Sequence, residues 1–322
     1  MAEARAQVRL PVIVGPTAGG KSGLAVSLAL EFERLGLGRG EIVSCDSVQV
    51  YRGLDIGSAK PTRAEQCGVV HHLIDLIEPT ERFSVSDWLS RAEAAIQEIR
   101  DREKIPIVVG GTHLYVKAFL EGLFAGPDPD PGLRAELEAM DPIERRAELE
   151  RVDPEAAERI HRNDHRRTIR AIEIHRLTGR PISALQEQWD TGIARRDCVL
   201  VGLDWPTGAI NRRINARVGT MIERGLVAEA RRLWEADRLG PTAREALGYK
   251  QLAAHFRGEC SLDQAIERIK IQTRRFGKNQ RTWLRRLRRT PASVWIHAAA
   301  EPSDDWVDIV LRCLGLARNA ER

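Results

Sequence analysis

The sequence predicts an α/β fold in which helices flank a parallel, doubly wound sheet, with a helical domain inserted into it. Residues 8–31, 41–46 and 105–123 each begin with a β-branched, apolar strand pattern, and the first and third continue through a glycine turn into a helical pattern. Repeated strand-to-helix crossovers indicate parallel strands. A chain of 322 residues, 43% hydrophobic and 30% charged, can build such a core in one large or two modest domains.

The first of these stretches contains a phosphate-binding spacing. Residues 15–22, GPTAGGKS, match the P-loop pattern GxxxxGK[ST] and lie between the strand pattern VRLPVIV (8–14) and a helical pattern that begins at Ser22. This context places the loop at a helix N-terminus, where backbone N–H groups wrap phosphates. Lys21 would neutralise those phosphates and the Ser22 hydroxyl would hold Mg²⁺. The predicted fold class is therefore a P-loop NTPase-like parallel sheet.

Polar side chains follow the other two strands. Asp46 comes directly after EIVSC (41–45), and Thr112 lies at the turn after IPIVV (105–109). Residues at the carboxyl ends of strands in an open α/β sheet point into the ligand crevice. The stretch HHLID (71–75) suggests a metal site, but adjacent strand residues face opposite ways, so we favour a core or loop role for His71 and His72.

The middle of the chain changes in composition. From Gly126 a turn region rich in proline and aspartate leads into charged, helical patterns with capping signals, which continue to about residue 190. We therefore place the first part of the core at residues 1–125, a helical insertion at 126–198 and the remainder of the core at 199–322. Arg166 and Arg170 share a helix face within the insertion, although such a charged face is commonly only solvated.

The C-terminal part is strongly basic. Between residues 267 and 289 ten Lys and Arg residues accompany one Glu, and Phe276 and Trp283 lie among them. Arginines beside aromatic rings neutralise phosphates and stack on bases, so this segment predicts an RNA surface. The competing interpretation is an amphipathic helix on a membrane surface. Polar residues interrupt its apolar face, however: Gln272, Thr273, Asn279 and Gln280. The excess of arginine, 43 against 7 lysines, suits phosphate binding, but a G+C-rich genome explains it equally well.

Composition also argues against other classes of protein. The cysteines at 45, 67, 198, 260 and 313 show no CxxC or metal-ligand spacing, so we predict neither a disulfide framework nor a zinc site. Neither the N-terminal apolar run nor any later one is long enough for a signal peptide or a membrane span. We expect a cytoplasmic protein without a membrane partner.

Motifs spread over nearly the whole chain resemble one family, the tRNA dimethylallyltransferases, also called tRNA isopentenyltransferases. In the family's order they are GPTAGGKS (15–22), DSVQVYRGLDIGSAKPT (46–62), VGGTHLY (109–115), NDHRRTIRAIE (163–173), EALGYK (245–250) and KNQRTWLR (278–285). A P-loop alone is shared with very many proteins. By contrast, DSxQVY followed by DIGxAKP and then GGTxLY is specific to this family.

The resemblance implies that dimethylallyl diphosphate is the donor and that its diphosphate leaves as pyrophosphate. The implied acceptor is N6 of adenosine 37, beside the anticodon, in tRNAs that read codons beginning with U. Mg²⁺ is the implied metal, the anticodon stem-loop of tRNA is the implied partner, and we expect a monomer. By the P-loop motif the diphosphate-binding residues are Gly15, Pro16, Thr17, Ala18, Gly19, Gly20, Lys21 and Ser22.

Two catalytic assignments follow from this chemistry. An adenine amine is a weak nucleophile because its lone pair is delocalised into the ring, so a positioned base must take a proton, and we assign that role to Asp46. Departure of the diphosphate calls for donors aimed at its charge, and we assign Thr17, beside the bridging oxygen, together with Lys21.

The implied tRNA contacts form several groups. By family position Ser47, Val48 and Gln49 line the pocket behind Asp46, and Thr112 and Arg134 lie along the path of the base. Residue 166 is usually glutamine in the family and is arginine here. The expected contacts in the three later segments are Arg166, Arg167, Thr168, Ile169, Arg170, Glu245, Ala246, Leu247, Gly248, Tyr249, Lys250, Lys278, Asn279, Gln280, Arg281, Thr282, Trp283, Leu284 and Arg285.

Two alternatives from other classes remain open. An adenylate isopentenyltransferase or a small-molecule kinase would share the loop and act on a free nucleotide, but it would not require the arginine face of the insertion or the basic C-terminal segment. A non-catalytic RNA-binding protein with a vestigial loop would have no need for intact Lys21, Ser22 and Asp46.

Overall fold

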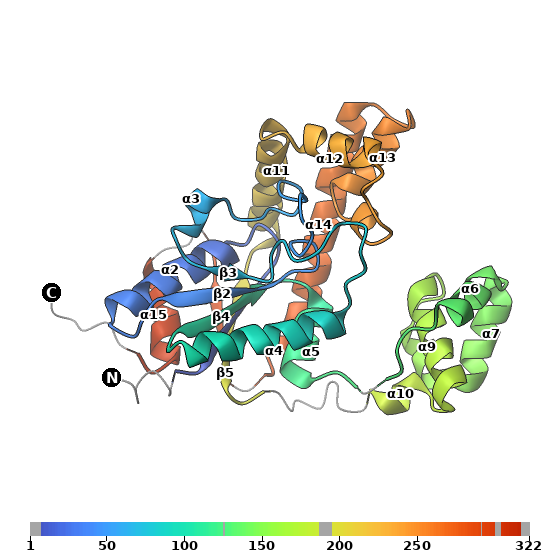
Figure 1. Cartoon of the computed structure of the whole chain (residues 1–322), viewed down its shortest axis with the longest axis horizontal. Helices are drawn as coiled ribbons and strands as arrows, with labels where there is room; N and C mark the ends of the chain where they lie inside the picture. Colours follow the sequence, from blue (N-terminus) through green and yellow to red (C-terminus); the bar gives the residue numbers. More distant parts are fainter. Residues whose placement is uncertain (1–7, 125, 187–194, 291, 300–303, 317–322) are drawn as a thin grey trace. The chain divides into compact units, whose positions relative to one another are not determined.

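The structure, a computed structural model, describes residues 8–124, 126–186, 195–290, 292–299 and 304–316 of the chain. Within these residues six parallel strands form one sheet, in the order β3-β2-β4-β1-β5-β6 (Figure 1). The strands are β1 (Leu10–Val14), β2 (Gly40–Cys45), β3 (His71–His72), β4 (Ile105–Gly110), β5 (Cys198–Asp204) and β6 (Ser293–His297). The predicted parallel α/β sheet is confirmed.

The three strands with predicted site residues at their ends lie next to one another. β2, β4 and β1 are buried along their whole length. Strands covered on both faces have near-continuous apolar sequences, which is why their patterns were visible. β5 and β6 extend the sheet beyond β1, and neither strand was expected from the sequence. His71 and His72, expected in the core or a loop, form the short edge strand β3.

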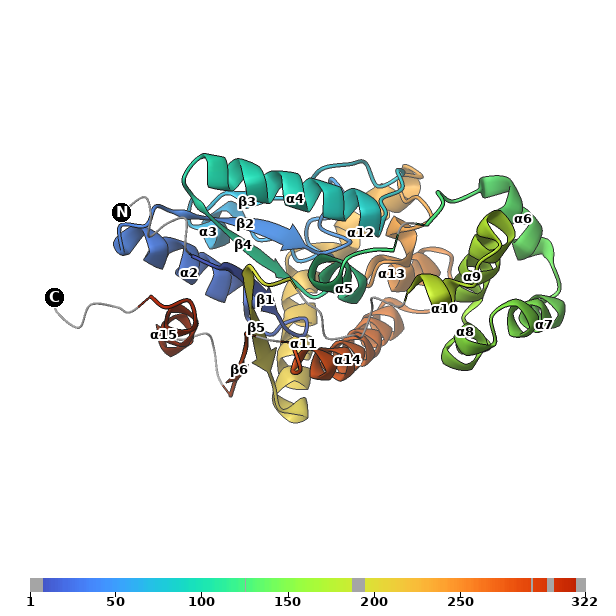
Figure 2. The same ribbon diagram turned by 90° about the horizontal axis from the view of Figure 1, so that it is seen from below.

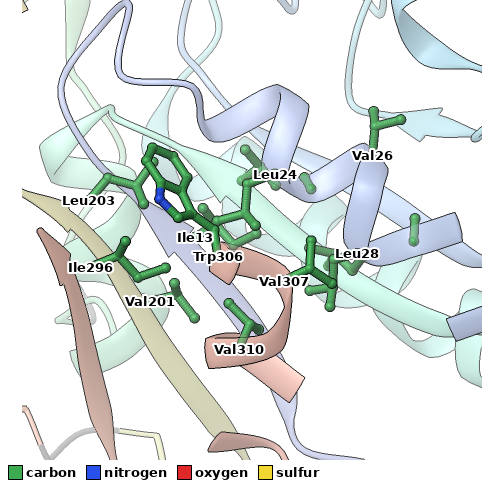
Figure 3. Close-up of a cluster of buried hydrophobic side chains, with 14 of the residues drawn as sticks. Ile13, Leu24, Val26, Leu28, Val201, Leu203, Ile296, Trp306, Val307 and Val310 are labelled. Atoms are coloured by element: carbon green, nitrogen blue, oxygen red, sulfur yellow. The ribbon is translucent and has the colours of Figure 1, made fainter. Parts of the chain in front are cut away.

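Helices cover both faces of the sheet. Figure 2 shows α4 (Val85–Asp101) on one face, with α2 (Lys21–Arg34) and α15 (Asp304–Cys313) on the other. α3 (Arg63–Gln66) precedes β3, and α5 (His113–Glu121) follows β4. The α2 face carries the core drawn in Figure 3, where Leu24 of α2 and Trp306 and Val310 of α15 belong to one buried cluster with Ile13 of β1. Burial of these side chains holds α2, the helix that follows the P-loop, against the sheet.

The C-terminal helices pack against the segment that follows β2. They are α11 (Thr207–Glu223), α12 (Leu226–Glu235), the 3₁₀ helix η1 (Ala243–Glu245), α13 (Tyr249–Phe256) and α14 (Leu262–Leu287). Val50, Tyr51 and Leu54 of the segment form a second buried cluster with Leu226 and Tyr249. This cluster builds one wall of the candidate site.

A carboxylate fastens the same segment through its backbone. Glu229 of α12 accepts the N–H groups of Asp55, Ile56 and Gly57 at 2.9–3.1 Å, and the Tyr249 hydroxyl donates to it at 2.6 Å. Consecutive backbone N–H groups form a concave anion site. Here a side chain 172 to 174 positions later in the chain occupies that site.

Residues Leu120–Ile193 form a separate compact unit, and the larger unit combines Met1–Phe119 with Ala194–Arg322. The small unit contains α6 (Pro131–Ala139), α7 (Pro142–Val152), α8 (Pro154–Arg159), α9 (His165–Thr178) and α10 (Ile182–Leu185). Asp130, Asp141 and Asp153 cap the first three helices, and each is followed by proline at the first helical position. The insertion was predicted at 126–198; this unit starts a few residues earlier and ends before β5 begins at Cys198.

Candidate active site

The loop between β1 and α2 has the backbone geometry of an anion cradle. Ala18 and Gly20 adopt positive φ angles of 59° and 87°. A Cβ at Gly19 would lie 2.8 Å from the carbonyl oxygen of Pro16, so no side chain fits there. Gly20 precedes α2 without a side-chain cap. The N–H groups of the first helical turn therefore remain available to an anion at this helix end.

Lys21 lies inside the cradle. Its Nζ donates to the carbonyl oxygens of Gly15, at 3.0 Å, and Pro16, at 2.8 Å. Burial lowers the pKa of Lys21 to about 8; the charge of Arg217 lowers it further and that of Asp46 opposes the shift. A cation destabilised in this way gains stability when a polyanion binds beside it.

Side chains from three distant positions hold the loop from outside. The Trp205 indole N–H donates to the Gly19 carbonyl oxygen at 3.1 Å. Arg213 donates to the Ala18 carbonyl oxygen at 2.9 Å and lies over the Trp205 ring at 4.8 Å. The Thr17 N–H donates to the side-chain oxygen of Gln280 at 2.7 Å. The cradle is therefore shaped by tertiary contacts as well as by its own glycines.

Asp46 directly follows β2, as predicted, and its carboxylate is held by the turn that it begins. Oδ1 accepts the N–H groups of Val48 at 2.8 Å and Gln49 at 3.2 Å. Oδ2 has no hydrogen-bond partner among the residues that the structure describes. One oxygen thus orients the group, and the other is available to accept a proton.

One cavity of about 520 Å³ joins these groups, and all of its lining belongs to the larger unit. The predicted site residues that line it are Thr17, Ala18, Lys21, Ser22, Asp46, Ser47, Val48, Gln49, Thr112, Glu245, Ala246, Leu247, Gly248, Asn279 and Gln280. Its apolar wall includes Ile42, Val109, Ile214, Val218, Met221 and Ile269. The cavity therefore combines a cationic end suited to phosphates with a wall suited to a hydrocarbon group.

Thr112 connects two of the strand ends around this cavity. Its hydroxyl oxygen accepts the Ser47 N–H at 3.1 Å and lies 3.4 Å from the Ser47 hydroxyl oxygen. The loops that follow β2 and β4 are therefore joined directly beside Asp46. His71 also lines the cavity, whereas His72 pairs with Glu41 at 2.7 Å, so the two histidines have separate partners.

Sequence reasoning missed Arg217, which lies on α11 and lines the cavity. Burial lowers its pKa, while the charge of Asp46 raises it. Arg217 and Lys21 thus form a pair of partly desolvated cations at one end of the cavity. Arg213 and Arg217 are spaced i, i+4 with Ile214 and Val218 beside them, a helical pattern visible in the sequence. That pattern did not reveal that α11 packs beside the P-loop.

In the larger unit, the predicted tRNA-binding segments 245–250 and 278–285 contain both exposed and buried residues. Lys278, Asn279, Thr282 and Arg285 are exposed on α14, and Lys250 is exposed beside Glu245. Arg281 is partly buried and donates to the Thr207 hydroxyl at 2.7 Å, and the partly buried Trp283 stacks on His113. Three further residues of these segments are buried: Tyr249, Gln280 and Leu284. Their contact with tRNA stays a prediction.

The insertion residues also divide. Arg166 and Arg167 are exposed on α9, whereas Thr168 and Ile169 are buried in the core of this unit, and the contact of all four with tRNA stays a prediction. Arg134 donates to the buried Glu173 at 2.8 and 2.9 Å, and Arg170 donates to the same carboxylate at 2.5 Å. A buried carboxylate requires such partners. Glu173 thus fixes the positions of Arg134 and Arg170 within this unit, and their contact with tRNA stays a prediction.

Comparisons with known protein families agree with one another. The family model described as IPP transferase matches residues 49–287, and the model described as isopentenyl transferase matches residues 8–77. A protein named tRNA dimethylallyltransferase 2 from Geotalea uraniireducens is 43% identical over 288 residues, which cover 88% of this chain and 91% of that protein. A tRNA dimethylallyltransferase from Anaeromyxobacter dehalogenans is 45% identical over 301 residues, which cover 92% and 97%.

Solved structures show the same similarity. The full-length tRNA isopentenylpyrophosphate transferase of Bacillus halodurans aligns with a TM-score of 0.68 and 36% identity, covering 95% of this chain and 97% of that one. A eukaryotic dimethylallyltransferase described as acting on tRNA aligns with a TM-score of 0.79 and 26% identity, covering 97% and 81%. The likeness thus extends through nearly the whole chain.

Proposed function

This chain belongs to the family of tRNA dimethylallyltransferases, and on that premise we propose that it transfers the dimethylallyl group of dimethylallyl diphosphate to N6 of adenosine 37 in tRNA. It is a prenyl-transferring enzyme that modifies tRNA. The observation that carries the proposal is a single cavity in which Lys21 and Arg217 lie near a P-loop, together with the carboxylate of Asp46 and an apolar wall. A site for phosphoryl transfer alone has no use for that wall, whereas an allylic donor fits it.

At the cationic end the cavity stabilises a leaving diphosphate. As the bond between C1 of the donor and the bridging oxygen breaks, its electron pair passes to the diphosphate. Lys21, Arg217 and the N–H groups at the start of α2 are placed to receive that charge, and the Thr17 hydroxyl is our donor to the bridging oxygen. Because these donors are already fixed before the reaction, little reorganisation is required in the transition state.

The acceptor reacts beside Asp46. The N6 amine attacks C1 of the dimethylallyl group, the new C–N bond forms, and one N6 proton passes to Asp46 Oδ2. The N–H groups of Val48 and Gln49 hold Oδ1 and so fix the direction of the carboxylate. Adenine 37 must leave the base stack of the anticodon loop to reach this position, and polar groups in the cavity lining are available to hydrogen-bond the edge of the adenine.

Mg²⁺ is the ion that we assign to the site, on the donor set. Ser22 supplies a hydroxyl oxygen to the same cavity as the phosphate cradle, and Mg²⁺ is held by such an oxygen together with substrate phosphates. When bound it would neutralise charge on the diphosphate. Ser22 would hold it at the start of α2.

The anticodon stem-loop of tRNAs that read codons beginning with U is the partner that we infer. Exposed basic residues on α14 and on the insertion, among them Lys278, Arg285, Arg166 and Arg167, support an RNA partner. We also infer that the enzyme acts as a monomer. In the part of the chain that the structure describes, no helix has the length and apolarity to span a membrane. We place the enzyme with its substrate in the cytoplasm.

A direct assay of acceptors tests this proposal. The protein is incubated with labelled dimethylallyl diphosphate, Mg²⁺ and either tRNA or AMP, ADP and ATP, and label is followed into nucleoside and pyrophosphate. We expect N6-dimethylallyladenosine in tRNA, one pyrophosphate per transfer and no consumption of ATP. Labelling of a free nucleotide in place of tRNA would make the protein an adenylate isopentenyltransferase and would contradict the proposal, as would phosphate transfer from ATP.

A further inference from the structure

Gln280 makes two hydrogen bonds that link separate parts of the active site. It lies on α14, and its side chain is only 3% exposed. Its side-chain oxygen accepts the Thr17 N–H of the P-loop at 2.7 Å, and its side-chain nitrogen donates to the carbonyl oxygen of Gly111, just past β4, at 3.0 Å. Both polar ends of the amide are thus satisfied, by two segments that follow neighbouring strands.

The surroundings leave the amide little freedom. A Cβ at Gly111 would lie 2.6 Å from the Gln280 side-chain nitrogen and 3.1 Å from the Gly15 carbonyl oxygen. Only glycine therefore permits this close approach. Gly277, one turn earlier on α14, would place a Cβ 3.1 Å from Ile214, so the helix is also close to α11. The position of Gln280 is set by packing on two sides.

The hydrogen bond from Thr17 also affects the cradle. The Thr17 N–H donates to Gln280 and is therefore not available to phosphate, although Thr17 lines the cavity. Lys21 is anchored on the carbonyl oxygens of Gly15 and Pro16, immediately before Thr17. A shift of Thr17 would therefore move the anchor of Lys21 as well. Displacements of about 1 Å in such groups can reduce rates by about 10²-fold.

We propose that Gln280 is a positioning residue that shapes the diphosphate cradle by holding Thr17 and Gly111 at a fixed spacing. Both ends of its amide are bonded to the protein backbone, so it acts through Thr17 and Lys21. The inference rests on the proposed function and extends it, because the helix that presents Lys278 and Asn279 to RNA also fixes the P-loop. The diphosphate site and the tRNA surface then share α14 as a common support.

The test compares variants with matched chemistry. Gln280→Met keeps the length of the side chain and removes both hydrogen bonds. Gly111→Ala displaces the Gln280 amide without changing Gln280. Gln97→Met, on the exposed face of α4, is the control for the same chemical change elsewhere. Each protein is titrated with pyrophosphate by calorimetry and with tRNA by filter binding, its Tm is measured, and single-turnover transfer is followed with labelled dimethylallyl diphosphate.

We expect Gln280→Met to weaken pyrophosphate binding by about 10-fold and to slow transfer by about 10- to 100-fold, with tRNA affinity close to wild type and a Tm lowered by only a few degrees through the loss of two hydrogen bonds. Gly111→Ala should have the same effect, and the double variant should be no worse than either single one, because both changes remove the same contact. Gln97→Met should match wild type in every measurement.

Gln280→Glu adds a readout that packing alone would not produce. A protonated carboxyl offers one acceptor and one donor, as the amide does, whereas the carboxylate cannot donate to Gly111. Burial and the negative charge of Asp46 favour the neutral form of the new carboxyl group, whereas the positive charges of Lys21 and Arg217 favour its charged form. We expect the rate of this variant, relative to wild type, to rise as the pH falls. If Gln280→Met does not fold, this profile decides the question.

Three results would overturn the inference: pyrophosphate binding and transfer equal to wild type in Gln280→Met, equal weakening of tRNA and pyrophosphate binding with a lowered Tm, or a pH-independent ratio in Gln280→Glu. The second result would mean that the residue only packs α14. If the wild-type protein transferred nothing to tRNA, the proposed function would fail. The pyrophosphate titration would still decide the function of Gln280, because it uses no tRNA.

Discussion

Replacement of Asp46 by asparagine separates the proton-accepting function of this residue from its local structural function. Asp46 Oδ1 accepts two N–H bonds, at 2.8 and 3.2 Å, and the amide oxygen of asparagine can accept the same pair. The turn should therefore persist while the base is lost. A positioned base contributes about 10²- to 10⁴-fold in rate, which corresponds to about 3–5 kcal/mol of transition-state stabilisation. We expect Asp46→Asn to slow transfer by that factor.

Asp46→Ala provides the comparison, because it removes the base and both hydrogen bonds of the turn. A hydrogen bond contributes about 1 kcal/mol net, so the alanine variant should lose about 1–2 kcal/mol of stability that the asparagine variant retains. The two variants should thus be similarly slow in transfer but differ in Tm. A rate difference in step with the Tm difference would instead indicate a purely structural function.

The assay is single-turnover transfer of labelled dimethylallyl diphosphate to saturating tRNA, with pyrophosphate release followed in parallel. Filter binding checks that tRNA affinity stays within a few-fold of wild type, since Asp46 is assigned to chemistry. An asparagine variant that folds, binds tRNA and transfers at nearly the wild-type rate would refute the assignment of Asp46 as the base.

Three further predictions concern charge. Burial lowers the pKa of Lys21 to about 8, and the protonated form binds the anion, so pyrophosphate affinity should fall as the pH rises above about 8. Lys21→Arg should abolish this fall in affinity. If calorimetric titrations of the variant show the same fall, another group causes it. Arg285 is exposed, whereas Arg281 donates a hydrogen bond to Thr207, so Arg285→Ala should reduce the slope of log K against log[salt] for tRNA binding by about one unit and Arg281→Ala by less. Filter binding at several salt concentrations measures both slopes. Identical slopes in the two variants and the wild type would place this helix face away from tRNA. Burial of Glu41 would raise its pKa, but hydrogen bonds from Arg102, Lys104 and His72 outweigh it and lower the pKa from 4.5 to about 2, so its stabilising effect is complete above about pH 4.5 and is lost as the pH falls towards 2. Glu41→Gln should therefore lower the free energy of unfolding in urea at pH 7 by about 2–3 kcal/mol, with a gap that narrows below pH 4.5; a gap of constant size would contradict the cause given for the shift.

Local sequence patterns were sufficient wherever a functional residue directly follows a strand. The glycine loop, Asp46 and Thr112 are each adjacent in sequence to β1, β2 or β4, and the structure places all three around one cavity. The parallel arrangement of buried strands makes adjacency to a strand end almost equivalent to adjacency in space. This part of the site required no knowledge of tertiary contacts.

The remainder depended on contacts between distant positions. Gln280 lies 263 positions after Thr17, and nothing in either segment indicates that they meet. Likewise, Arg217 could be identified as a site residue only from the packing of α11 beside the P-loop. Arg134 and Arg170 also have an internal partner that the sequence did not indicate, the buried Glu173, which lies 39 positions after Arg134. The choice of partner for a buried charge depends on the folded chain.

The binding of the N–H groups of residues 55–57 by the Glu229 carboxylate has a consequence for folding during protein synthesis. Synthesis proceeds from the amino terminus, so the P-loop and the segment 46–62 leave the ribosome long before α12, whose Glu229 lies 172 to 174 positions after the N–H groups that it binds. During that interval those N–H groups lack the carboxylate that they bind in the folded protein, and the wall of the cavity lacks its support. A chain released before α12 is made would carry every P-loop residue together with Asp46 and Thr112, and would still lack the support against which a donor must rest.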